Sequence, residues 1–68
     1  MKEHHQIIRL KDDIELDVSL WYEFKKGETK PLIFYRNISL YINNIGTDIT
    51  YLLTEQQKEV IKRELEIY

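Results

Sequence analysis

The amino-acid sequence predicts an α+β fold, a three-stranded antiparallel meander (ββ(β)α) with one C-terminal helix packed on one face. Two observations lead to this class. Apolar side chains fall on every second position of residues 14–24, IELDVSLWYEF, which is the period of a strand with one buried face. After residue 54, apolar side chains recur at helical spacing instead. At 68 residues we expect a single small domain covering residues 1–68.

A short apolar strand precedes the central one, and the polar run 11–13 is expected to join the two as a hairpin. If Leu10 pairs with Ile14, then Ile8 lies opposite Leu16. Both pairs place apolar side chains on the same face as the central strand, so the expected register is self-consistent.

The third strand is predicted at residues 32–42, after a polar turn that contains Gly27 and Pro31. Antiparallel pairing with the central strand, with Phe24 facing Leu32, matches apolar residues along most of the length.

One pair in this register conflicts with the pattern, because Leu20 would face Arg36. Either Arg36 reaches out to solvent from a continuous strand, or a bulge near Arg36 reverses the side-chain directions. We expect the continuous strand. In the bulged alternative, Ile33 and Tyr35 would turn inward and their neighbours would turn outward.

A turn at residues 43–46 and a short extended or single-turn segment at 47–50 lead to the predicted helix. Thr54 is its expected N-cap, with Gln57 at the spacing of a capping box and Glu55 in the first turn. The apolar stripe that should face the sheet consists of Val60, Ile61, Leu65 and Tyr68.

One helix covers only one face of the sheet, so the opposite face is the candidate binding surface. With a continuous third strand it joins an aromatic cluster to a row of carboxylates. Trp and Tyr are frequent at binding hot spots, and an exposed apolar patch rimmed by polar groups usually marks an interface. The predicted protein-binding residues are Trp21, Tyr35, Tyr41, Ile33, Glu15, Asp17 and Glu23.

Three interpretations of this face are open. Trp21 and Tyr35 could form only a stabilising cross-strand pair, worth roughly 0.2–1 kcal/mol. The face could bind another protein or a second copy, and its acidic row would suit a basic partner surface. It could also stack single-stranded nucleic acid, although Glu15, Asp17 and Glu23 would repel the phosphate backbone. We expect the protein interface.

The composition argues against several other classes. The chain has no cysteine, which excludes disulfides and thiolate metal sites. Its net charge of −2 argues against a protein that binds the phosphates of nucleic acid. The pair His4-His5 fits a frayed segment at residues 1–5 better than a metal site. We expect no cofactor, no metal and no catalytic residue, since nothing supplies a perturbed acid or an activated nucleophile. Without a membrane-spanning run or signal-peptide pattern, we expect a cytoplasmic protein.

The segment at residues 39–57, SLYINNIGTDITYLLTEQQ, resembles a pattern in small uncharacterised proteins of tailed bacteriophages and prophages. In those proteins, a strand and an Asn-containing turn lead to a D-I-T-x-L-L-[ST]-E-x-Q helix start. The resemblance covers the C-terminal half and implies a turn, then buried Leu52 and Leu53, then a capped helix. It implies a viral origin but no catalytic or binding residue.

Small phage proteins without a pocket or motif often bind and block a host protein, including defence and restriction machinery, and this analogy sets the functional expectation. We expect a non-enzymatic, phage-encoded modulator or inhibitor of a host protein, acting in the host cytoplasm through the open sheet face. The alternatives are a structural homodimer without a host target, formed by two open faces or an edge strand, and single-stranded nucleic-acid binding.

Overall fold

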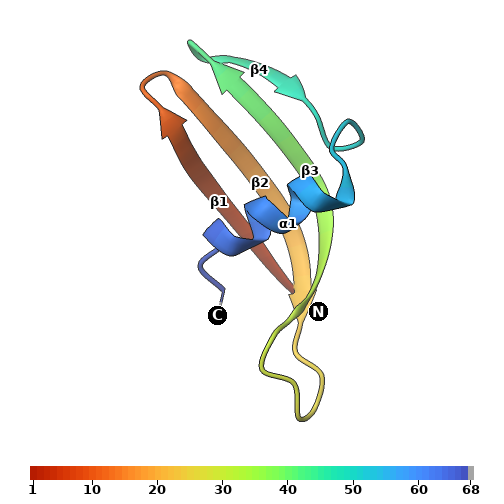
Figure 1. The fold of residues 1–68 in the computed structure, drawn as a ribbon. Coiled ribbons are helices and arrows are strands. Elements are labelled where there is room, and N and C mark those ends of the chain that lie inside the picture. The colour runs from red at the N-terminus through yellow and green to blue at the C-terminus, as the bar shows by residue number, and fades with distance from the viewer. Residues whose placement is uncertain (68) are drawn as a thin grey trace.

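The computed structural model describes residues 1–67, which form four antiparallel strands and one helix. The sheet has the meander order β1-β2-β3-β4, and the helix crosses one of its faces (Figure 1). The α+β class and the C-terminal helix are therefore confirmed, but the sheet has four strands rather than three. The elements are β1 (Lys2–Lys11), β2 (Ile14–Glu23), β3 (Leu32–Ile42), β4 (Ile45–Asp48) and α1 (Glu55–Glu64).

Strand β1 is longer than the sequence suggested, because residues 2–5 belong to it and are not frayed. Its ladder with β2 begins where Lys2 pairs with Tyr22. His4 faces α1, and its ring meets the ring of Tyr22 edge-on, with the centroids 6.3 Å apart. The ten-residue β2 thus offers a pairing partner along the whole of β1, which orders a segment that is polar in sequence.

The hairpin between β1 and β2 confirms one expected pair and corrects the other. Ile8 lies opposite Leu16 as predicted. Ile14, however, pairs with Lys11, because a register shift between residues 9 and 11 leaves Leu10 as an extra residue.

Strand β4 occupies the segment that was expected to be a turn and a short extended piece. Asn43 and Asn44 have left-handed backbone angles (φ 50° and 66°), as a two-residue type I′ hairpin requires, so Ile45 already pairs back onto Ile42. Gly46 therefore belongs to the strand and not to the turn. A Cβ atom there would lie 2.7 Å from a ring carbon of Tyr41, so the ring covers the glycine.

A β-bulge at Arg36 sets which side chains of β3 face the helix. Ser19 pairs with Asn37, but the next residue, Leu20, pairs with Tyr35, so Arg36 is the extra residue. The expected continuous strand was wrong. Leu20 is almost fully buried, and a continuous register would place a guanidinium opposite it, at a high cost in desolvation.

The register on the two sides of this bulge differs by one residue. Towards the β2–β3 loop, Leu32 pairs with Glu23 rather than with Phe24. On the other side the expected pairs are confirmed, as for Leu16 with Leu40. The sequence pattern thus predicted the register from residue 37 to residue 42 and missed it from 32 to 35.

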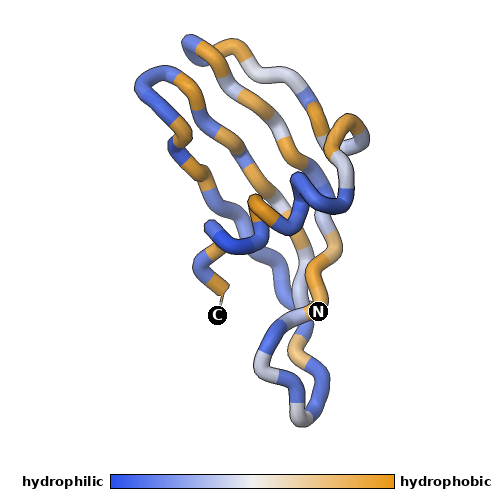
Figure 2. Tube along the Cα trace, viewed as in Figure 1, coloured by the Kyte–Doolittle hydropathy of each residue, from blue (hydrophilic) through white to orange (hydrophobic). Residues whose placement is uncertain are grey.

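The core lies between α1 and the middle of the sheet. Figure 2 shows hydrophobic and hydrophilic residues alternating along the strands, and successive side chains of a strand point to opposite faces, so the buried ones lie on one face. Val18 and Ile38 are fully buried at its centre, and Ile61 and Leu65 cover them from the helix. Burying each such side chain contributes about 1.5–3 kcal/mol. Ile61 and Leu65 are buried as expected, but the helix ends at Glu64, and Leu65 has an extended backbone just beyond it.

Two other apolar positions lie elsewhere than expected. Val60 is 54% exposed, and Leu52, expected to be buried, is 74% exposed, whereas Leu53 does pack against the core. The reason is that residues 50–52 form a turn, which points Leu52 away from the sheet. Tyr68, assigned to the helical stripe, lies outside the described residues.

Both ends of α1 are fixed by side-chain hydrogen bonds. At its start the predicted capping box is present, since the Gln57 amide donates to Thr54 Oγ1 and the Thr54 amide donates to the Gln57 side chain. At its end the Gln6 side-chain amide donates to the Glu64 carbonyl and accepts from the Glu66 amide, each at 2.9 Å. Gln6 thereby ties the helix C-terminus to β1.

Thr50 extends the hydrogen bonding of β3 beyond the last residue of β4. Its buried hydroxyl oxygen accepts from the Ile38 amide at 2.8 Å, and the hydroxyl donates to the Asp48 carboxylate. The Thr50 amide donates to the same carboxylate oxygen at 2.9 Å. These two Thr50 donors, followed by the Asn37 side chain, lower the pKa of Asp48.

Replacing this hydroxyl tests its structural role. Thr50→Val keeps the shape but leaves the Ile38 amide without its acceptor, so we expect a loss of about 1–3 kcal/mol in the free energy of unfolding, measured by urea denaturation. Thr50→Ser keeps the hydroxyl and should retain most of the stability. Equal losses for the two variants would contradict the assigned role.

Acid titration tests the carboxylate. The folded-state pKa of Asp48 is lowered below its ordinary value of 3.8, so its contribution is present above that value and is lost as the pH falls through the lower, folded pKa. We expect the melting temperature of Asp48→Asn to fall less steeply than that of wild type below about pH 5. Identical slopes for the two proteins would rule out this linkage.

Candidate functional site

The face of the sheet that α1 does not cover is called the open face here. Successive side chains of β2 point to opposite faces, and the register with β1 and β3 shows which of their residues share the open face. From β2 and β3 it presents Glu15, Asp17, Trp21, Glu23, Leu32, Phe34 and Tyr41. Five of the seven predicted binding residues therefore lie where the sequence placed them.

The other two predicted residues, Ile33 and Tyr35, lie on the opposite side of the sheet, and this corrects the expected face. Both pack against the core, and the Tyr35 hydroxyl donates to the Lys58 carbonyl of α1 at 3.0 Å. The bulge at Arg36 is the cause, because it reverses the side-chain directions of residues 32–35 relative to the unbulged register.

Phe34 takes the place that was expected for Tyr35. It lies directly opposite Trp21, and Leu32 lies opposite Glu23. Phe34 is 44% exposed, Leu32 39% and Trp21 37%, so a contiguous apolar strip faces solvent. The bulged alternative would have identified both residues from the sequence.

Charged side chains hold the Trp21 ring in place. The indole N–H donates to Glu3 Oε1 at 3.2 Å, and the Arg36 guanidinium lies over the ring, 5.6 Å from its centroid. Arg36 and Glu3 also form an ion pair at 3.8 Å. Trp21, Phe34, Leu32, Glu3 and Arg36 are called the aromatic cluster below. The sequence did not predict the roles of Glu3 and Arg36, because they depend on the longer β1 and on the bulge.

The acidic residues of the open face are partly paired with bases of β1. His5 contacts Asp17, and Arg9 contacts Glu15 with 3.3 Å between Nη2 and Oε1. The Arg9–Glu15 ion pair lies at the surface, where such a pair contributes little to stability. A partner's cation can therefore compete for the Glu15 carboxylate at small cost.

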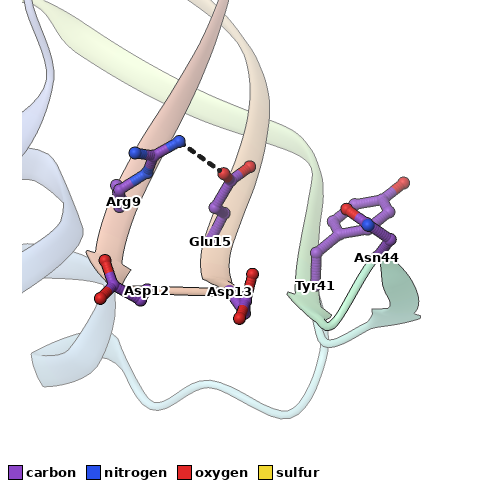
Figure 3. A pocket seen from close by; sticks show the side chains of 6 residues that line it. All are labelled: Arg9, Asp12, Asp13, Glu15, Tyr41 and Asn44. Atoms are coloured by element: carbon purple, nitrogen blue, oxygen red, sulfur yellow. Dashed lines mark hydrogen bonds and ion pairs between the residues drawn. The ribbon is translucent and has the colours of Figure 1, made fainter.

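The acidic row ends in a shallow hollow of about 430 Å³ between the tips of two hairpins (Figure 3). The Asn43 amide donates to the Asp13 carbonyl at 2.9 Å, which joins the two tips. In Figure 3 the side chains of Arg9 and Glu15 point toward one another from neighbouring strands. The hollow is lined by Arg9, Asp12, Asp13, Glu15, Tyr41 and Asn44.

The hollow brings the three carboxylates of Asp12, Asp13 and Glu15 together with the guanidinium of Arg9. Within residues 1–67, no group of three or more His, Cys, Asp or Glu side chains is arranged to hold a metal ion. Nor is any helix of that part of the chain long and apolar enough to cross a membrane. What the open face offers is an apolar strip beside a row of carboxylates.

No protein-family model matches this chain, and no curated protein or solved structure gives a significant match.

Paired alanine variants test the assignment of the two faces. Tyr35→Ala removes a ring from the core and a hydrogen bond to α1, so we expect it to lower the free energy of unfolding by about 2–3 kcal/mol. Phe34→Ala removes an exposed ring of similar size and should cost about 1 kcal/mol or less. Urea denaturation measures both, and the reverse order of the two losses would contradict the bulged register.

Proposed function

We propose that this protein is a non-enzymatic protein-binding module whose open face takes a basic surface of another protein. The observation that supports this most is the solvent-facing pair Trp21 and Phe34, with Glu23 next to Trp21 and with Asp17 and Glu15 further along the same face of β2. Large aromatic side chains supply most of the energy at many interfaces, and carboxylates set the charge of the partner they select.

The aromatic cluster suits the role of an apolar anchor. Glu3 and Arg36 hold the Trp21 indole in one orientation before binding, which lowers the entropy lost when a partner immobilises it. Leu32 and Phe34 widen the apolar contact along β3.

The hollow beyond Glu15 suits a lysine or arginine side chain of the partner. Asp12 and Asp13 add two carboxylates to it, and the Tyr41 ring offers an apolar wall for the methylene stem of such a side chain. The net charge of −2 favours the approach of a basic surface and disfavours nucleic acid.

We further propose that the chain is a phage-encoded modulator or inhibitor of a host protein, such as a component of a defence system, acting in the host cytoplasm. The support for this step is the resemblance of residues 39–57 to the small proteins of tailed phages and prophages.

Capture from bacterial lysate tests the proposal with three matched baits. Wild-type protein and Glu59→Gln, which alters an exposed carboxylate of α1, should retain the same protein. Trp21→Ala should weaken that capture about 30-fold, the effect of losing a hot-spot residue worth about 2 kcal/mol. Equal capture by all three baits, with the fold intact by circular dichroism, would remove the open face from consideration.

Trp21 is the sole tryptophan, so its fluorescence separates protein from nucleic-acid binding. The purified partner should shift its emission, and Glu15→Lys should weaken the titration. A single-stranded oligonucleotide should leave the emission unchanged even at low salt. A shift by the oligonucleotide that disappears at high salt would instead favour nucleic-acid binding.

A further inference from the structure

Helix α1 is too short to cover the whole of the sheet face against which it packs. Its ten residues are about 15 Å long. The eleven residues of β3 extend about 35 Å, and α1 crosses them at an angle (Figure 1). The end of this face near the Asn43–Asn44 turn therefore has no helix above it.

The uncovered end carries a row of isoleucines from three strands. Ile14 pairs with Ile42, and Ile42 pairs with Ile45, so the three side chains lie side by side on the helix side of the sheet. Ile42 is 47% exposed and Ile45 is 72% exposed. Leu40, half-buried beside them, continues the row toward the core.

Val60 borders this row from the helix. Lys58 and Lys62 line a groove beside Tyr35, on the flank of α1 that faces the β2–β3 loop. With 100° between successive helical residues, Val60 falls on the other flank, toward Ile42. It is 54% exposed. We call Ile14, Leu40, Ile42, Ile45 and Val60 the apolar shelf.

The surface area of the chain indicates that a large patch is left uncovered. The chain exposes 5415 Å². A compact monomer of 8.3 kDa is expected to expose about 4600 Å², which is about 800 Å² less. One partner in a standard interface contributes about 800 Å². The excess belongs to the whole chain, which measures 42 × 21 × 20 Å, and the exposed side chains of this row supply part of it.

Charge decides which of the two faces can meet a copy of itself. The five residues of the apolar shelf are uncharged, and Lys11, which pairs with Ile14, borders them, so two shelves can meet through their apolar side chains with Lys11 at the rim. The open face instead carries the carboxylates of Glu15, Asp17 and Glu23 together with His5, Arg9 and Arg36, so it is a charged surface and not an apolar one.

We propose that the protein is a homodimer in which the apolar shelves of two copies pack against each other. This interface is separate from the open face and does not depend on the function proposed for it. In such a dimer both open faces remain exposed, so one dimer presents two copies of the binding surface, and a partner with two matching sites would be held more tightly.

The test is the mass in solution at about 100 μM, a concentration at which a dimer with a dissociation constant of about 1 μM is nearly complete. Wild-type protein should have twice the chain mass of 8.3 kDa by multi-angle light scattering. Ile45→Asp should have the mass of one chain. The matched control Ile7→Asp alters an isoleucine of β1 that is 55% exposed on the opposite face, and it should remain a dimer.

Ile45→Thr is a milder variant for use if Ile45→Asp fails to fold, because threonine retains a high β propensity. It should raise the dimer dissociation constant at least tenfold in sedimentation equilibrium. A wild-type mass other than twice that of the chain would overturn the proposal. So would a folded position-45 variant that dimerises as wild type does, or an Ile7→Asp variant that loses the dimer. None of these masses depends on binding at the open face, so the two proposals can fail separately.

Discussion

The exclusion of Arg36 from the core is the constraint on which the rest of the structure depends. A guanidinium cannot lie unpaired beside fully buried Leu20, and β3 avoids this by adding one residue to the strand. The extra residue places Arg36 over the Trp21 ring on the open face and turns Tyr35 toward α1. The composition of both faces follows from this single bulge.

The mismatch between a short helix and a long sheet creates the second surface. The capping box fixes where the helix begins, and Gln6 of β1 ties the helix end to the sheet by binding the backbone on both sides of it. The helix seals the centre of the sheet around Val18 and Ile38. The two faces that remain differ in kind, since one joins aromatic rings to carboxylates and the other is apolar. That difference is why we assign a foreign basic partner to the first and a second copy to the second.

The sequence predicts most of this fold because its apolar pattern has a strict period of two along β2. That period fixed which residues of β2 face α1 and the pairing of β2 with the second half of β3. The capping box at Thr54 likewise fixed the start of the helix. The pattern could not predict that two polar segments form strands. Residues 2–5 become a strand only because β2 is long enough to pair with them, and β4 forms only because Asn43 and Asn44 adopt left-handed backbone angles.

The candidate site was predicted in location but not in full composition. Trp21, Tyr41 and the acidic row lie on the open face as expected, whereas the second aromatic residue is Phe34 and not Tyr35. The difference is one inserted residue, which reverses the direction of every side chain before it in the strand. Glu3 and Arg36 could not be assigned without the bulge and the full length of β1.

The bulge can be tested directly by nuclear Overhauser effects between assigned aromatic protons. The account predicts cross-peaks between the Trp21 indole and the Phe34 ring, and between the Tyr35 ring and protons of Lys58 and Ile61 in α1. Cross-peaks between Trp21 and Tyr35, with Phe34 in contact with the helix, would contradict it.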